Sequence, residues 1–243
     1  MAAARKVTNL QLASRRLDGL LLRPGRTFSF NRVVGSCTSR AGHVEGMRLS
    51  NGEASAGVGG GICQLANLLH WMVLHSPLTV TERSEHSFDP FPDNGRVVPW
   101  GTGCSIVYNY VDLCARNDTD LTLQLRARVG ERHLRGELRA DATPPHTYSV
   151  HARDEEFVRL GDTYLRRNEL WRRVIDRGTG DTVREECVRR NAAVVKSRYA
   201  RSNRPTLGSG VAVRSGKVCD RPSAAALCDR PSARCARPPW GMG

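Results

Sequence analysis

Apolar side chains recur at helical spacing between residues 62 and 76, and this stretch predicts the most regular helix of the chain. One face carries a continuous apolar stripe, made by Ile62, Leu65, Ala66, Leu69, Met72 and Val73. The opposite face is apolar as well, through Leu68, Trp71 and Leu74. A helix that is apolar on both faces is buried on both faces, and Pro77 ends it because proline lacks the N–H that a helix needs.

The rest of the pattern is mainly that of strands. Residues 7–22 place apolar groups at the spacing of a further, amphipathic helix. From Leu78 onward apolar and polar residues alternate, most clearly from Leu121 to Val129. Turn sequences such as "LGD" and "DRGTGD" separate the alternating stretches, as in an antiparallel meander. The pattern predicts an α+β fold, in which a central buried helix packs on an antiparallel β-sheet and the C-terminal half is rich in strands.

The composition changes after about residue 201. The segment "CDRPSA" occurs twice there, in surroundings rich in proline, alanine, serine and arginine. Such a composition buries too little apolar surface to offset the entropy of ordering the chain. We therefore divide the sequence into an N-terminal helix (1–22), a central domain (23–145), a β-rich extension (146–200) and a disordered basic tail (201–243).

The formal net charge is +13, and 34 of the 37 basic residues are arginines that are spread along the whole chain. No recognition helix, zinc finger or aromatic-basic stacking pattern accompanies this charge, so we expect no specific nucleic-acid partner. An anionic cell-wall polymer or membrane surface fits the charge equally well. No apolar run is long enough for a transmembrane segment, and the first residues lack the apolar core of a secretory signal, so the sequence as given predicts a cytoplasmic protein.

The eight cysteines form no C-x-x-C motif, so the sequence predicts neither a zinc ribbon nor a thioredoxin-type site. Outside the tail their number is odd, which fits free thiols better than a disulfide framework. We expect structural roles for Cys37, Cys104, Cys114 and Cys187. Because the histidines and Cys63 match no standard spacing of metal ligands, we predict no metal site and no cofactor.

Cys63 differs from the other cysteines in what precedes it. The chain reads "GVGGGICQL", so Gly59, Gly60 and Gly61 come directly before the predicted helix. Glycines let backbone N–H groups approach a ligand, and a helix N-terminus stabilises a thiolate. Cys63 is therefore a candidate nucleophile, with these N–H groups as an oxyanion hole and Gln64 as a further donor. The alternative is an ordinary core cysteine that follows a flexible turn.

A nucleophilic cysteine usually needs a base. His70 shares a helix face with Cys63, but seven residues at a rise of about 1.5 Å place it roughly 10 Å away along the helix. His86, in a polar loop after a predicted strand, is the better candidate, and Arg83 can orient it or bind a carboxylate. We expect His70 and His75 to pack the helix instead.

Other polar and aromatic residues near these motifs are predicted to be structural. Asp112 is expected to cap a helix or to form a salt bridge. Core or sheet-face positions, rather than a stacking platform, are expected for Phe28, Phe30, Tyr108 and Tyr110.

The motifs around these residues resemble those of the VanW family. The resemblance rests on "RPGRTFSFNRVVG", "GHVEGMRLSNGEASAGVGGGICQL", "ERSEHSFDPF" and "YNYVDLCARNDTD", and it extends from about residue 7 to about residue 195. It implies a cell-wall and glycopeptide-resistance context. Some proteins with VanW domains are regarded as peptidoglycan L,D-transpeptidases with a cysteine nucleophile, which Cys63 matches. His86 matches the motif histidine, and Gln64 and Arg83 match further motif positions.

The sequence departs from the family pattern at one acid. Many VanW domains have an acidic residue in a "G-x-D-A-T" stretch, where this chain reads "GTGCSI". If that acid orients the histidine, Asp112 or Asp89 must replace it here. The resemblance also implies a segment ahead of the first helix, so we expect an incomplete N-terminus, and the cell envelope becomes the alternative location.

The function that we expect is a cysteine-dependent acyltransferase that acts on a peptidoglycan stem peptide or precursor. The alternative is a non-catalytic accessory protein that binds a cell-wall precursor or a glycopeptide in the same cleft. A nucleic-acid binder is a third hypothesis, and it rests on the charge alone.

Overall fold

The computed structural model describes residues 2–50, 53–84, 98–131, 133–160, 163–195 and 212–215. The helical elements are α1 (Ala2–Leu17), α2 (Phe30–Val34), the 3-10 turn η1 (Ser39–Ala41) and α3 (Cys63–Leu74). The strands are β1 (Leu20–Leu22), β2 (Thr27–Ser29), β3 (Glu45–Ser50), β4 (Glu53–Val58), β5 (Thr79–Glu82), β6 (Cys114–Arg116), β7 (Leu123–Val129), β8 (Leu134–Ala140), β9 (His146–Leu160), β10 (Thr163–Asp176), β11 (Thr182–Val195) and β12 (Ala212–Ser215).

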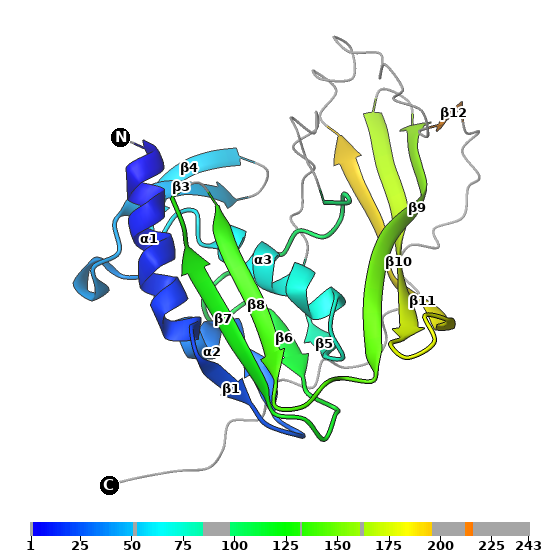
Figure 1. Ribbon diagram of the computed structural model, residues 1–243. Coiled ribbons are helices and arrows are strands. Elements are labelled where there is room, and N and C mark those ends of the chain that lie inside the picture. Colours follow the sequence, from blue (N-terminus) through cyan, green and yellow to red (C-terminus); the bar gives the residue numbers. More distant parts are fainter. Residues whose placement is uncertain are drawn as a thin grey trace, which may run out of the picture.

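Within the described residues, the strands form sheets with the orders β1-β7-β8, β2-β6-β5, β3-β4 and β11-β10-β9-β12. Neighbouring strands run antiparallel, except that β12 runs parallel to β9. Figure 1 shows α1 beside β7, α3 behind β8, and the long strands β9, β10 and β11 as a separate layer. The predicted α+β fold with a strand-rich C-terminal half is confirmed.

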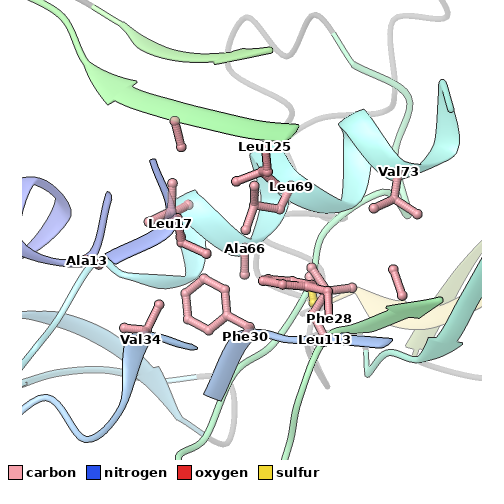
Figure 2. Packing of buried hydrophobic residues seen from close by; sticks show 14 of the residues in the cluster. Ala13, Leu17, Phe28, Phe30, Val34, Ala66, Leu69, Val73, Leu113 and Leu125 are labelled. Atoms are coloured by element: carbon pink, nitrogen blue, oxygen red, sulfur yellow. The ribbon is translucent and has the colours of Figure 1, made fainter. Parts of the chain in front are cut away.

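The helix α3 is buried on more than one side, as its sequence predicts. Figure 2 shows Leu69 of α3 between Leu125 of β7 and Phe30 at the start of α2. All three side chains are buried, and each contributes about 1.5–3 kcal/mol by leaving water. The strand β8 approaches α3 so closely that a Cβ atom on Gly136 would lie 2.2 Å from the sulfur of Met72. The middle and the C-terminal half of α3 are therefore held in position by this packing.

The first helix ends earlier than its apolar spacing predicts. α1 ends at Leu17, and Leu20–Leu22 form β1, which pairs with β7. Gly19 explains the change, because its φ of +88° lies in the left-handed region that interrupts a helix. Its N–H donates to the Leu125 carbonyl at 2.9 Å, which starts the strand pairing. The prediction of a helix as far as residue 22 is therefore wrong at its C-terminal end.

Ion pairs between arginine and glutamate cross the strands β9, β10 and β11. Three of them are Arg172–Glu186 at 2.5 Å, Arg153–Glu185 at 2.6 Å and Arg190–Glu169 at 2.8 Å. Such pairs at the surface contribute about 0–1 kcal/mol each, so they set strand register more than they set stability. Part of the arginine excess is therefore used inside this sheet.

Trp100 joins the C-terminal sheet to the rest of the fold. Its carbonyl accepts a hydrogen bond from Nδ2 of Asn168 at 2.9 Å, and the Arg166 guanidinium lies 4.9 Å from the centre of its ring. Asn191 donates to Oδ1 of Asn168 at 2.9 Å. These side chains are buried, and the hydrogen bonds between them replace bonds that the same atoms would otherwise make to water. The contact fixes the position of Trp100, and with it the start of the segment that follows.

Of the predicted basic tail, residues 201–243, only 212–215 are among the described residues, and they form β12. The prediction of disorder falls on residues outside that part of the chain. No helix among the described residues is long and apolar enough to cross a membrane.

Candidate active site

The glycine loop before α3 requires glycine for reasons of shape. Gly59 and Gly61 have φ values of +78° and +93°, which side chains strongly disfavour. Gly60 lies against Gly46 of β3, where an added Cβ atom would be 2.2 Å from the carbonyl carbon and oxygen. A Cβ atom on Gly59 would lie 2.4 Å from the Cβ atom of Cys37. The loop is therefore a closely packed turn.

Asn9 of α1 fixes this loop by hydrogen bonds to its backbone. Its side chain is fully buried, and Nδ2 donates to the carbonyls of Val44 and Gly60, each at 2.9 Å. The N–H of Gly59 donates to the Val44 carbonyl at 3.0 Å, and the N–H of Gly60 donates to Gly57 at 3.1 Å. Two N–H groups that the sequence assigns to an oxyanion hole are therefore already used within the protein.

Cys63 lies at the N-terminus of α3, as predicted, and its side chain is half-buried. Among the described residues, no group accepts a hydrogen bond from the N–H of Gly61, Ile62 or Cys63 itself. The N–H of Gln64 donates to the Gly61 carbonyl at 3.1 Å, and the Gln64 side chain is exposed. Three consecutive N–H groups at this helix start therefore have no acceptor among the described residues, and the helix dipole favours negative charge there.

One face of α3 is covered by an extended segment, residues 100–106. Three side chains of α3, each about one turn from the next, contact this segment. Their contacts fall on alternate residues of the segment, 106, 104 and 102. The contacts join Cys63 Sγ to the Ile106 carbonyl oxygen at 4.0 Å, Asn67 Oδ1 to the Cys104 N–H at 2.6 Å, and His70 Nδ1 to the Thr102 carbonyl oxygen at 2.8 Å. The shared helix face therefore serves to position the segment 100–106 beside the thiol.

His70 is a structural histidine, as predicted. It is 4% exposed, and because a carbonyl can only accept, its Nδ1 carries the hydrogen in the bond to Thr102. Burial, reinforced by the Arg83 charge, lowers the pKa of His70 to about 4. The ring is therefore neutral at physiological pH, and its role is to pack and to hydrogen-bond the Thr102 carbonyl.

This gives a testable pH dependence. The folded pKa of about 4 lies below the unfolded value, so the unfolded chain takes up a proton first as the pH falls. The contribution of neutral, buried His70 to the free energy of unfolding is complete above about pH 6.5. It is lost as the pH falls towards 4, and the total loss is about 3 kcal/mol. In urea titrations His70→Gln should remove this part of the pH dependence. His75→Gln, at the exposed end of the same helix, should keep it, and equal slopes for all three proteins would contradict the assignment.

Arg83 holds the segment 100–106 by hydrogen bonds to its backbone carbonyls. Its Nε donates to the Gly103 carbonyl at 3.0 Å, and Nη2 donates to the Gly101 carbonyl at 2.7 Å. Gly101 has a φ of +87°, and a Cβ atom there would lie 2.0 Å from Nδ2 of Asn191. The stretch that lacks the acid of the family pattern is thus held through its backbone carbonyls. In the described residues Arg83 supports the site by positioning it.

Asp112 acts as a cap, which is one of the roles predicted for it. Its carboxylate accepts hydrogen bonds from the Ser29 hydroxyl at 2.5 Å, from the Asn31 N–H at 2.9 Å and from the Leu113 N–H at 2.8 Å. Ser29 is itself the N-cap of α2. The carboxylate is therefore committed to the start of α2.

Tyr108 and Tyr110 are placed differently from the prediction. Their side chains are 45% and 85% exposed, so both lie outside the core and off any sheet face. Both belong to a tight turn closed by Val107 and Val111, whose carbonyls also accept from Nδ2 of Asn31. The alternation of "SIVYNYVDL" is typical of a strand, but the left-handed Asn109 turns the chain back before a strand can form.

Two further thiols, Cys37 and Cys104, lie within electrostatic range of Cys63. Burial raises the pKa of both, that of Cys104 to about 12, and the neighbouring Cys63 adds to the shift. No disulfide links the cysteines among the described residues. The structural role predicted for Cys37 and Cys104 agrees with these environments, because a thiol that stays protonated is a poor nucleophile.

His86 and Asp89 lie outside the described residues, so the predicted base stays a prediction. Sequence reasoning missed Asn9 and the pair Asn168 and Asn191, which fix the loop and the segment 100–106. Asn9 could have been found, because a polar residue at a position that the apolar spacing of α1 buries must hydrogen-bond within the protein.

The comparisons with known proteins agree with these motifs. The family described as "VanW like protein" matches residues 5–139. Vancomycin B-type resistance protein VanW of Enterococcus faecalis is 35% identical over 178 residues, which cover 73% of this chain and 65% of that protein. The uncharacterized protein YoaR of Bacillus subtilis is 38% identical over 96 residues, 38% of this chain and 32% of that protein. No solved structure matches significantly. The chain therefore belongs to the VanW family.

Proposed function

We propose that this protein is a thiol acyltransferase that acts on peptidoglycan stem peptides, with Cys63 as its nucleophile. The observation that carries the proposal is the position of Cys63 at the start of α3, beside three N–H groups that no described group uses. An acyl transfer needs a nucleophile and donors for the oxyanion at one place, and this helix start offers both.

In the proposed reaction, the Cys63 thiolate attacks a peptide carbonyl carbon of the stem peptide. The carbonyl electrons move to the oxygen, and the N–H groups of Gly61, Ile62 and Cys63 hold the resulting oxyanion. The carbon–nitrogen bond then breaks, the terminal amino acid leaves with a proton from the base, and a thioester remains. An acceptor amine or water attacks the thioester, gives its proton to the base and restores the thiolate. His86 is the base in this proposal.

The choice of substrate rests on the family. The relative from Enterococcus faecalis is named for vancomycin resistance, a property of the cell wall, and the chain covers 65% of that relative. The family supports a cell-wall substrate, while the thiol at a helix start supports acyl transfer. The substrate class and the thiol chemistry can therefore be tested separately.

Alkylation followed by peptide mapping tests the nucleophile. With limiting iodoacetamide, Cys63 should be modified first, and a soluble stem peptide should slow its modification. Cys187 is the internal control, because it is also half-buried but lies on β11. Labelling of Cys63 no faster than Cys187, or without protection by the peptide, would contradict the proposal.

A further inference from the structure

The net positive charge of the chain is distributed unevenly, although arginines occur throughout it. Residues 1–50 contain nine lysines and arginines but only two acidic residues, whereas residues 51–200 contain twenty of each kind. The nine lie on α1, α2, η1 and β3 and in the turn between β1 and β2, and eight of them are exposed. The N-terminal segment therefore carries a net charge of +7, while residues 51–200 are neutral overall.

Ion pairs do not neutralise the charge of this segment. The arginines of β9, β10 and β11 pair with glutamates, as in Arg190–Glu169 at 2.8 Å. Of the two acids in residues 1–50, Asp18 is engaged by Arg126 of β7 at 2.7 Å. In the part of the chain that the structure describes, no ion pair involves any of the nine basic side chains of the segment. Their charge therefore suits an anionic partner.

These basic residues surround α1 on one side of the molecule. The helix packs against both α2 and β3, and the loop after η1 reaches it too, since a Cβ atom on Gly42 would lie 3.6 Å from Cδ1 of Leu12. Figure 1 shows α1, α2 and β3 together on the side away from the C-terminal sheet. The exposed arginines of these elements are here called the basic surface, and they are Arg5, Arg15, Arg16, Arg32, Arg40 and Arg48.

An exposed aromatic turn, residues 107–111, adjoins the basic surface. Nδ2 of Asn31 in α2 donates to two carbonyls of this turn, at 3.2 and 2.9 Å, and Arg32 is the next residue on the helix. Val107 and both tyrosines of the turn are exposed. Apolar groups that stay exposed beside charged ones are typical of surfaces that meet another protein or a membrane.

We propose that the basic surface and the aromatic turn bind the surface of a membrane that contains anionic lipids. The lipid phosphates attract the arginines. Tyrosine suits the boundary between headgroups and acyl chains, because its ring is apolar and its hydroxyl is polar. A phosphate polymer in water also attracts arginines, but it offers the exposed ring of Tyr110 no apolar phase. The combination of charge and exposed aromatic groups therefore favours the lipid surface over the polymer.

Sedimentation of the whole chain with sucrose-loaded vesicles tests the proposal. The wild type should bind vesicles made of equal parts of phosphatidylglycerol and phosphatidylcholine, should not bind pure phosphatidylcholine, and should be released as the salt concentration rises. The double variant Arg15→Gln/Arg16→Gln should weaken binding about tenfold or more. Tyr110→Ser, which changes no charge, should weaken binding about threefold or more, because the ring no longer leaves water.

Each of these changes has a matched control elsewhere in the fold. The double variant Arg139→Gln/Arg190→Gln removes the same charge from exposed arginines of β8 and β11 that pair with glutamates. Val183→Ser removes an exposed apolar side chain from β11. Both controls should bind like the wild type. Cys63→Ser should also bind like the wild type, which separates this result from the fate of the proposed acyl transfer.

The side chains of Arg15, Arg16 and Tyr110 are exposed, so their variants should fold, and circular dichroism checks that they do. Polyphosphate at the same phosphate concentration should displace little of the bound protein. The proposal is overturned if the wild type does not sediment with the anionic vesicles, if neutral vesicles bind it equally, or if polyphosphate releases it completely. Normal binding by folded Arg15→Gln/Arg16→Gln or by folded Tyr110→Ser overturns it as well.

Discussion

Gly60→Ala should destabilise the protein by more than about 3 kcal/mol, although it adds a single methyl group. The added carbon would lie 2.2 Å from the carbonyl carbon and oxygen of Gly46, and backbone atoms on both sides cannot rotate away. Relief would require β3 and the loop to separate, which breaks the bond from Asn9 to the Gly60 carbonyl. Urea unfolding followed by circular dichroism measures the effect.

Gly178→Ala is the control for this change. Gly178 lies in the turn between β10 and β11, and a Cβ atom there would meet only Oδ1 of Asp176, at 3.3 Å. We expect a change within about 1 kcal/mol. Equal stability of Gly60→Ala and Gly178→Ala would show that the loop is not packed against β3 in solution.

Cys63→Ala should reduce conversion of a stem peptide by at least about a thousandfold, because covalent catalysis cannot proceed without its nucleophile. Cys104→Ala is the matched control, since Cys104 is buried near Cys63 and plays no part in the proposed reaction. It should keep most of the activity. Chromatography of the peptide products gives the rates, and folded Cys63→Ala with wild-type turnover would contradict the assignment.

The central elements of the fold follow from local patterns. The helix Cys63–Leu74 was predictable because its apolar residues recur at a helical period, and β7 because its residues alternate. The period was ambiguous at Leu20–Leu22, where a short apolar run fits helix and strand alike. There the left-handed Gly19 decided the outcome. The prediction for Tyr110 was wrong for a similar reason, because alternation cannot distinguish a strand from a tight turn closed by Val107 and Val111.

The candidate site was predictable only in part. Glycines before a cysteine at a helix start point to a site on chemical grounds, and the structure places Cys63 there. The sequence could not tell which N–H groups remain available, because the partners of Gly59 and Gly60 depend on tertiary contacts. The roles of Asn168 and Asn191 were unpredictable for the same reason, because they arise only where strands distant in sequence meet Trp100.

The most direct test of the central claim is the intact mass of the protein after brief reaction with a stem peptide and acid quenching. We expect a covalent adduct whose added mass equals the acyl part of the peptide. Digestion should place it on the peptide that contains Cys63, and the adduct should be absent from Cys63→Ala. An adduct on another residue, or turnover of the peptide by wild type without any adduct on Cys63 under single-turnover conditions, would contradict the account.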